Sequence, residues 1–151
     1  MAKKVRLYSV KVLSKDQGSS NKVRGSEAMI SNAMMGMAFV ANDSQTRHCP
    51  NGTVANMSFK TWQSRAMNDL AKDLLLNAGV FVVAAAGNGN HSASLISPAS
   101  EPSLCTVGAT DKYNHMASFS NHGPIVDILA PGVDVLSASF SNTTAWVGHS
   151  L

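Results

Sequence analysis

The run VFVVAAA at residues 80–86 constrains the fold of this chain more than any other segment. It contains no polar residue, and an uninterrupted apolar run of this length is typical of a strand buried on both faces, as in a parallel sheet. The preceding residues 61–78 carry apolar side chains at three- and four-residue spacing, and Gly79 follows them. This pattern predicts a helix with a glycine stop. A helix that leads directly into a buried strand favours an α/β fold.

Strand and helix patterns alternate along the rest of the chain. Ser26 is expected to cap a helix that extends to Asn42, after a polar loop at residues 16–25. Further short strands are predicted at residues 6–13, 54–59, 105–109, 126–129 and 133–137. The alternation predicts a doubly wound, mostly parallel sheet, in which chemistry is expected at the carboxyl ends of the strands.

Composition narrows the class of protein. The chain has 151 residues, enough for one domain, and 44% of them are hydrophobic. No apolar stretch is long enough to span a bilayer, so no membrane partner is expected. The net charge is +3, but the basic residues are dispersed and no aromatic platform accompanies them. Nucleic acid is therefore not an expected partner. The N-terminal Met-Ala-Lys-Lys is not followed by an apolar segment, so no signal peptide is expected in this sequence.

Two polar residues are candidates for chemistry. Asn88 follows Gly87 at the end of the apolar run, where its side-chain NH₂ could point at a developing negative charge. Ser150 is next to the last residue, and a serine hydroxyl becomes a nucleophile when a histidine accepts its proton. The alternative interpretations are a turn-forming asparagine and a solvent-exposed serine. The adjacent His149 is not expected to act as the base for Ser150. The other histidines have no metal-ligand spacing and are expected to be surface residues: His48, His91, His115 and His122.

Segments along most of the chain match, in order and spacing, those of one enzyme family. They are YSVKVL, CPNGTVANMS, VFVVAAAGN, SPASEPSLCTVGATDKY, ASFSNHGPIVDILAPGVDVLS and the final GHS. The chain resembles the subtilisin family of serine endopeptidases, most closely its secreted, proteinase K-like fungal branch. The resemblance implies a subtilisin-like three-layer α/β fold, truncated here at both ends, with residues 1–151 forming the central part of a peptidase domain. The family's Asp-Thr-Gly and His-Gly-Thr-His segments have no counterpart in this sequence.

The resemblance also implies roles for individual residues. Ser150 matches the catalytic nucleophile, and Asn88 matches the side chain that stabilises the oxyanion. Two segments match the walls of the substrate pocket, namely Ser58 and Phe59 on one side and Ala85, Ala86 and Gly87 on the other.

Two departures from the family motifs bear on this site. The family has Ser-Leu-Gly-Gly-Gly where this chain has Ser58-Phe59-Lys60-Thr61-Trp62, and the added side chains are expected to obstruct the approach of a substrate backbone. The family's Gly-Thr-Ser-Met is replaced by Gly148-His149-Ser150-Leu151.

A calcium site and the state of the cysteines are also implied by the resemblance. The backbone carbonyls of Pro102 and Leu104 and the carboxylate of Asp127 match a family Ca²⁺ site, and hard oxygen ligands suit this ion. The ion would serve stability; alternatively, Asp127 only caps a loop. Cys49 and Cys105 match cysteines whose partners lie outside this segment, so they are not expected to bond to each other.

Three functional hypotheses remain. The first is a serine endopeptidase acting on proteins or peptides, inactive as this segment alone unless a complementing chain supplies the missing half-domain. The second is a non-catalytic homologue that serves as a binding or decoy module. The third is an unrelated nucleotide-binding domain, which the absence of a glycine-rich fingerprint disfavours. Secretion is implied by the resemblance, and the sequence contains five Asn-x-Ser/Thr glycosylation motifs, at Asn42, Asn51, Asn56, Asn90 and Asn142.

Overall fold

Four parallel strands form the centre of the fold, in the order β1-β3-β5-β6. They are β1 (Thr53–Met57), β3 (Val80–Ala85), β5 (Cys105–Thr110) and β6 (Ile128–Pro131). The computed structural model describes residues 5–13, 30–47, 49–137 and 146–148 of the chain. The register pairs Val54 with Phe81, Val83 with Cys105, and Val107 with Ile128. The predicted α/β class with a parallel sheet is confirmed.

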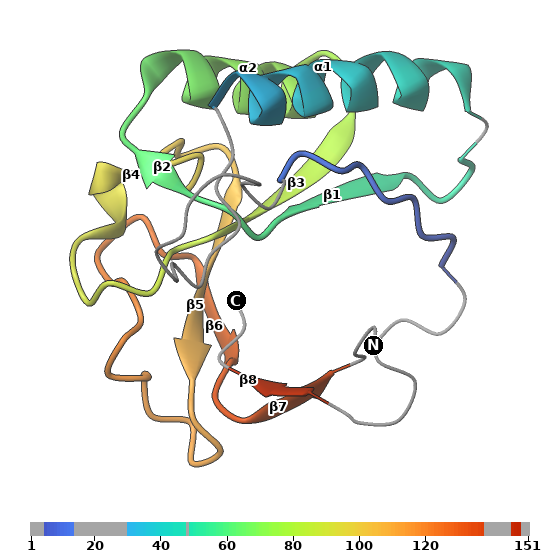
Figure 1. The fold of residues 1–151 in the computed structure, drawn as a ribbon. Helices are drawn as coiled ribbons and strands as arrows, with labels where there is room; N and C mark the ends of the chain where they lie inside the picture. Colours follow the sequence, from blue (N-terminus) through green and yellow to red (C-terminus); the bar gives the residue numbers. More distant parts are fainter. Residues whose placement is uncertain (1–4, 14–29, 48, 138–145, 149–151) are drawn as a thin grey trace, which may run out of the picture.

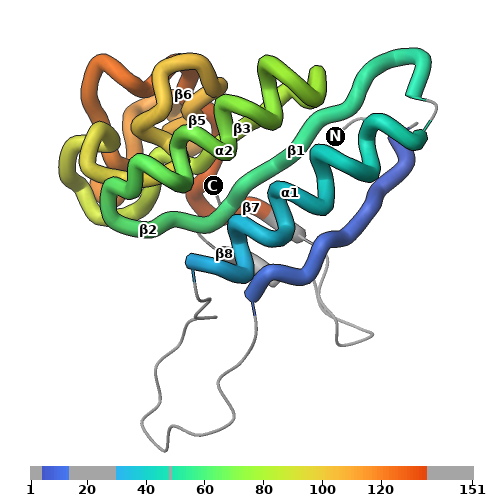
Figure 2. The backbone as a smooth tube through the Cα atoms, turned by 90° about the horizontal axis from the view of Figure 1, so that it is seen from above, coloured from blue at the N-terminus to red at the C-terminus, as the bar shows by residue number. Residues whose placement is uncertain are grey.

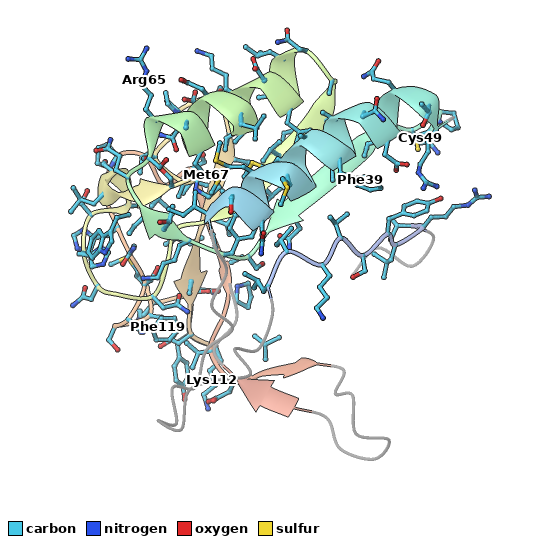
Figure 3. All side chains as sticks on the ribbon, turned by 45° about the horizontal axis from the view of Figure 1, so that its top comes forward. Phe39, Cys49, Arg65, Met67, Lys112 and Phe119 are labelled. Carbon is cyan, nitrogen blue, oxygen red and sulfur yellow. The ribbon has the colours of Figure 1, made fainter. Side chains whose placement is uncertain are left out.

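Two helices, α1 (Ile30–Thr46) and α2 (Arg65–Leu76), lie side by side over one face of this sheet (Figure 1; Figure 2). Met67 of α2 points toward the sheet, whereas Arg65 points away into solvent (Figure 3). Between the helices and the sheet lies a core whose largest members are fully or almost fully buried: Met37, Met57, Met67, Leu74, Val80, Val82, Ile96 and Leu104. Burial of these side chains holds the layers together and fixes where β3 ends.

The opposite face of the sheet carries exposed apolar side chains. Val54, Phe81 and Ile128 share this face by register and are 65%, 51% and 55% exposed. The prediction that residues 80–86 are buried on both faces is therefore wrong for the described part of the chain. The physical reason is that α1 and α2 pack on the same face, and no helical layer among the described residues covers the other face.

Helix α2 begins later than the periodicity predicted. Thr61–Trp62 form strand β2, which pairs antiparallel with β4 (Ile96–Ser97). Ser64 then caps the helix, since its hydroxyl accepts from the backbone N–H of Met67 and its own N–H donates to Ser97 Oγ at 2.8 Å. Side-chain spacing cannot distinguish a cap from a first helical turn, so residues 61–64 were wrongly included in the helix.

Residues 6–13, predicted as a strand, form no strand in the structure. No backbone hydrogen bond between described residues joins them to β1. Val10 and Val12 instead lie against α1, where a Cβ atom on Gly36 would meet the side chain of Val12, whereas Leu7 and Tyr8 are exposed. Alternation specifies an extended chain with one apolar side, and a helix can cover that side as well as a neighbouring strand can.

The remaining elements are short. Ala93–Leu95 form a 3₁₀ helix before β4, and β7 (Val135–Ser137) pairs antiparallel with β8 (Trp146–Gly148). Strand β6 begins two residues later than predicted, because Val126 closes a turn with Gly123 and Asp127 bonds to Thr106. Helix α1 extends four residues past its predicted end, and Asp43 and Arg47 form an ion pair one turn apart at that end. None of the helices in the described ranges could cross a membrane.

Candidate functional site

The candidate site lies at the carboxyl end of β3. The strand ends at Ala85, after which Ala86 and Gly87 are buried and Asn88 emerges into solvent. The N–H of Ala86 donates to the carbonyl of Val107 at 2.9 Å, which continues the pairing with β5 beyond the strand. Among the described residues the side-chain amide of Asn88 has no hydrogen-bond partner. The expectation that Asn88 lies at the carboxyl end of a strand agrees with its placement.

Residues 119–122 hold the loop that carries Asn88. Asn90 N–H donates to the carbonyl of Phe119 at 2.9 Å, and His122 N–H donates to the carbonyl of His91 at 3.1 Å. Asn121 lies between these contacts and is fully buried. Phe119 and the loop residue Lys112 lie near the carboxyl end of β5, the strand beside β3 (Figure 3). The loop is thus attached to the same edge of the sheet as the strand tips.

The other predicted wall lies directly beside this loop. Met57 pairs with Ala84 across β1 and β3, so Ser58 and Phe59 follow alongside Ala85 and Ala86. Ser58 is exposed and its Oγ accepts from Asn56 Nδ2 at 3.0 Å, whereas Phe59 is half-buried and packs on the core. The structure therefore brings the five predicted wall residues together, but directs Phe59 toward the core.

Lys60 narrows the space between the two walls. Its Cδ atom lies 3.2 Å from the position that a Cβ on Gly87 would occupy. The lysine is exposed, and in the described part of the chain it forms no ion pair. The Lys60 stem thus lies against Gly87, beside the position that the resemblance gives to a substrate backbone. The expected obstruction of that backbone stays a prediction.

Trp62 and His91 are in contact across the two walls. Their rings stack with centroids 5.6 Å apart and an interplanar angle of 24°. His91 is half-buried, so its interpretation as a surface histidine is incomplete. The stacking joins the two walls through residues that are far apart in sequence, and no local pattern signals it.

Ser150 and His149 lie outside the described residues. The backbone of β8 is described through Gly148, which pairs with Val135 of β7. The predicted role of Ser150 as nucleophile therefore stays a prediction.

The candidate calcium ligands lie at the opposite edge of the sheet, at the amino ends of β5 and β6. Asp127 precedes β6; its Oδ2 accepts from Thr106 N–H at 2.7 Å, and its own N–H donates to the Thr106 carbonyl at 2.9 Å. Pro102 and Leu104 belong to the turn before β5. The described residues contain no group of three or more His, Cys, Asp or Glu side chains that could hold a metal. A cation here would thus depend on backbone carbonyls around one carboxylate, an all-oxygen set that fits Ca²⁺.

Both cysteines are free thiols in the structure. Cys49 is exposed shortly after α1, and Cys105 is half-buried at the start of β5.

The chain is similar in sequence to known proteins of one family. The model of the subtilase family of peptidases matches residues 1–150. Proteinase R of Parengyodontium album is 47% identical over 150 residues, which cover 99% of this chain and 34% of that protein. The cuticle-degrading protease of Metarhizium anisopliae is 50% identical over 137 residues, covering 91% and 33%. The chain thus spans about a third of the length of these relatives.

A solved structure agrees with the sequence matches. A cold-adapted subtilisin-like serine proteinase superposes with a TM-score of 0.73 at 35% identity, covering 82% of this chain and 44% of that one.

Proposed function

Because the chain belongs to the subtilase family, we propose that it is part of a serine endopeptidase that hydrolyses peptide bonds by acyl transfer. One observation carries the proposal. An exposed asparagine amide with no partner among the described residues stands at the tip of β3, on a loop whose neighbours are buried. An unengaged donor held at a strand end is what stabilisation of an oxyanion requires.

In this proposal Ser150 and Asn88 act on the same carbonyl group. The Ser150 hydroxyl attacks the carbonyl carbon while a histidine accepts its proton, and the Asn88 NH₂ donates to the resulting oxyanion. The aspartate and histidine of the triad come from outside these 151 residues, which contain neither family motif. The segment alone is therefore expected to be inactive, since its serine has no general base.

The substrate, the location and the cation are parts of the same proposal. Proteins or peptides are the proposed substrates, with the backbone lying between residues 58–60 and 85–87. An extracellular location follows from the likeness to fungal proteases, one of them named as cuticle-degrading. A structural Ca²⁺ would be held by Asp127 and the carbonyls of Pro102 and Leu104, where it would link the amino ends of β5 and β6.

A second candidate function is a non-catalytic binding or decoy module. The position of Lys60 favours it, since the lysine stem covers Gly87 where a substrate backbone would approach. A segment that cannot admit a substrate would leave Asn88 without a catalytic use.

A chimaeric enzyme tests the proposal. Residues 1–150 replace the matching stretch of Proteinase R, which supplies the rest of the catalytic domain. We expect hydrolysis of a fluorogenic peptide, abolished by Ser150→Ala. Asn88→Ala should lower kcat about 10²- to 10³-fold, as removal of the equivalent donor does in a subtilisin.

Asn51→Ala is the matched control, because Asn51 is an exposed asparagine in the turn before β1, at the opposite end of the sheet from the Asn88 loop. A chimaera that folds but does not cleave would favour the decoy function. Equal activity of the Asn88→Ala and Asn51→Ala enzymes would remove Asn88 from the mechanism.

A further inference from the structure

Asn121 makes four hydrogen bonds to the loop that carries Asn88. Its Nδ2 donates to the carbonyl of Ala86 at 2.8 Å, and its backbone N–H donates to the carbonyl of Gly87 at 2.8 Å. Its Oδ1 accepts from the N–H of Gly89 at 2.9 Å and from that of His91 at 3.2 Å. Asn121 is 0% exposed.

These contacts bracket Asn88 on both sides. The bonded groups belong to the two residues before it and to the first and third residues after it. Asn88 itself receives none of them, so its side chain stays available while its backbone is held. Both acceptor positions of the Asn121 amide oxygen are used, which fixes the orientation of the amide as well as its position.

The loop needs such support because its own sequence does not define one conformation. Gly87 has φ of +101° and Asn90 has φ of +51°, both in the left-handed region. Gly89 adds a second glycine to the same loop. Residues of this kind leave the chain many conformations unless tertiary contacts select one.

The side chain of Asn121 also packs closely against Gly87. A Cβ atom on Gly87 would lie 2.6 Å from Asn121 Nδ2. The glycine is therefore required for the asparagine to approach, and the two residues form one unit.

We infer that Asn121 is a positioning residue for the oxyanion donor: its buried amide holds residues 86–91 so that Asn88 is already placed when negative charge develops. The inference rests on the proposed function and deepens it. Preorganisation of this kind contributes to kcat because no loop reorganisation accompanies the reaction. A purely structural asparagine would affect stability but would not act through Asn88.

The first test needs no substitution. In the full 151-residue chain, hydrogen exchange measured by NMR should show protected amides at Gly89 and His91, although Gly89 is an exposed residue. The amide of Lys112, an exposed loop residue whose N–H has no partner among the described residues, is the reference for free exchange. Exchange of the Gly89 and His91 amides as fast as that of Lys112 would overturn the inference.

The second test is a double-mutant cycle in the chimaera with Proteinase R. Asn121→Ala should lower kcat about 10- to 100-fold with KM changed less than about threefold, because alignment rather than binding is lost. In the Asn88→Ala background the same substitution should have little further effect on kcat, because a residue that acts through Asn88 has nothing left to position.

Thr106→Val is the matched control for loss of a buried hydrogen bond. Thr106 is 0% exposed and its Oγ1 donates to the carbonyl of Ala99 at 2.8 Å, away from the 86–91 loop. It should leave kcat within about twofold of the parent, since a stability effect alone does not alter the folded site. Equal losses from Asn121→Ala in both backgrounds, or from Thr106→Val, would overturn the inference while leaving the proposed function intact. An inactive parent chimaera would count against both.

Discussion

The two sides of the candidate site are built differently. Residues 85–91 are held from within, by a fully buried asparagine that bonds to backbone groups. Residues 58–62 are held by strand pairing of β2 with β4, and their side chains at Lys60 and Trp62 are exposed. The side that carries Asn88 is thus specified by buried polar contacts, whereas the side that carries Lys60 and Trp62 presents surface side chains. Surface side chains can change without loss of the fold, which explains how Lys60 and Trp62 can occupy a site that glycines fill in the family motif.

The largest expected effect comes from Gly87→Ala, which tests how tightly the first side is held. The added methyl group meets Asn121 Nδ2 at 2.6 Å and Lys60 Cδ at 3.2 Å, at a φ of +101°. We expect the free energy of unfolding to fall by about 2 to 4 kcal/mol, from backbone strain together with a displaced hydrogen bond. Urea unfolding of the chain measures it.

Gly52→Ala provides the control for backbone strain alone. Gly52 also has a positive φ, +86°, but nothing lies within 4 Å of its added Cβ. Its cost should be only about 1 kcal/mol. If both substitutions cost the same, the loop is not tightly packed against Asn121 and the contrast between the two sides is lost.

Lys60→Gly tests the second side and should have an intermediate effect. Lys60→Gly removes the side chain that lies against Gly87 and leaves more room between the walls. KM for a peptide substrate should therefore fall roughly tenfold in the chimaera, equivalent to about 1.4 kcal/mol. Lys112→Gly, which removes an exposed loop lysine outside the site, should leave KM unchanged. A KM that does not respond to Lys60→Gly would mean that the lysine moves aside without cost.

The smallest expected effect is a pH effect at Asp111. Like Asn121, this residue has a side-chain oxygen that accepts from two backbone N–H groups, but it lies in a partly exposed loop. Its Oδ1 accepts from the N–H of Tyr113 at 2.8 Å and of His115 at 2.9 Å. Partial burial raises the pKa of this carboxyl, but the N–H groups of His115 and Tyr113 and the His115 side chain lower it, with a net pKa below the ordinary 3.8.

The pH dependence follows from that direction. Because the folded-state pKa is below the unfolded one, the stability gained from this turn is present above pH 3.8 and is lost as the pH falls through the folded pKa. NMR titration of the Asp111 carboxyl carbon should give a midpoint below 3.8, with only a slight change in unfolding midpoint across that range. A midpoint at or above the ordinary value would show that exposed turns of this type do not hold their backbone as the buried asparagine does.

Sequence patterns predicted most of the elements but not their partners. The run at residues 80–86 became β3 almost to the residue, and Gly79 follows α2 with a positive φ as expected of a stop. Residues 6–13 were predicted as a strand because alternation describes only the local conformation, whereas a strand also needs a hydrogen-bonded neighbour. Residues 61–62 were assigned to a helix because their pairing with β4 depends on a segment more than thirty positions along the chain.

The positions of Asn88 and of residues 85–87 could be predicted from sequence because they lie at the end of a strongly patterned strand. Their proposed roles, and those of Ser58 and Phe59, come from the resemblance and stay predictions. The role of Asn121 could not be predicted, because nothing in the run Phe119-Ser120-Asn121-His122 distinguishes a buried asparagine that bonds to another loop from a residue of an ordinary polar loop. The sequence by itself determined the α/β class, the family and the position of Asn88 beyond the end of β3, since apolar periodicity and motif order are properties of the linear chain. Only the tertiary structure decided which polar group holds the loop that carries Asn88 and which side chain lies against Gly87, because such contacts join residues that are distant in sequence and acquire their strength only when burial excludes water.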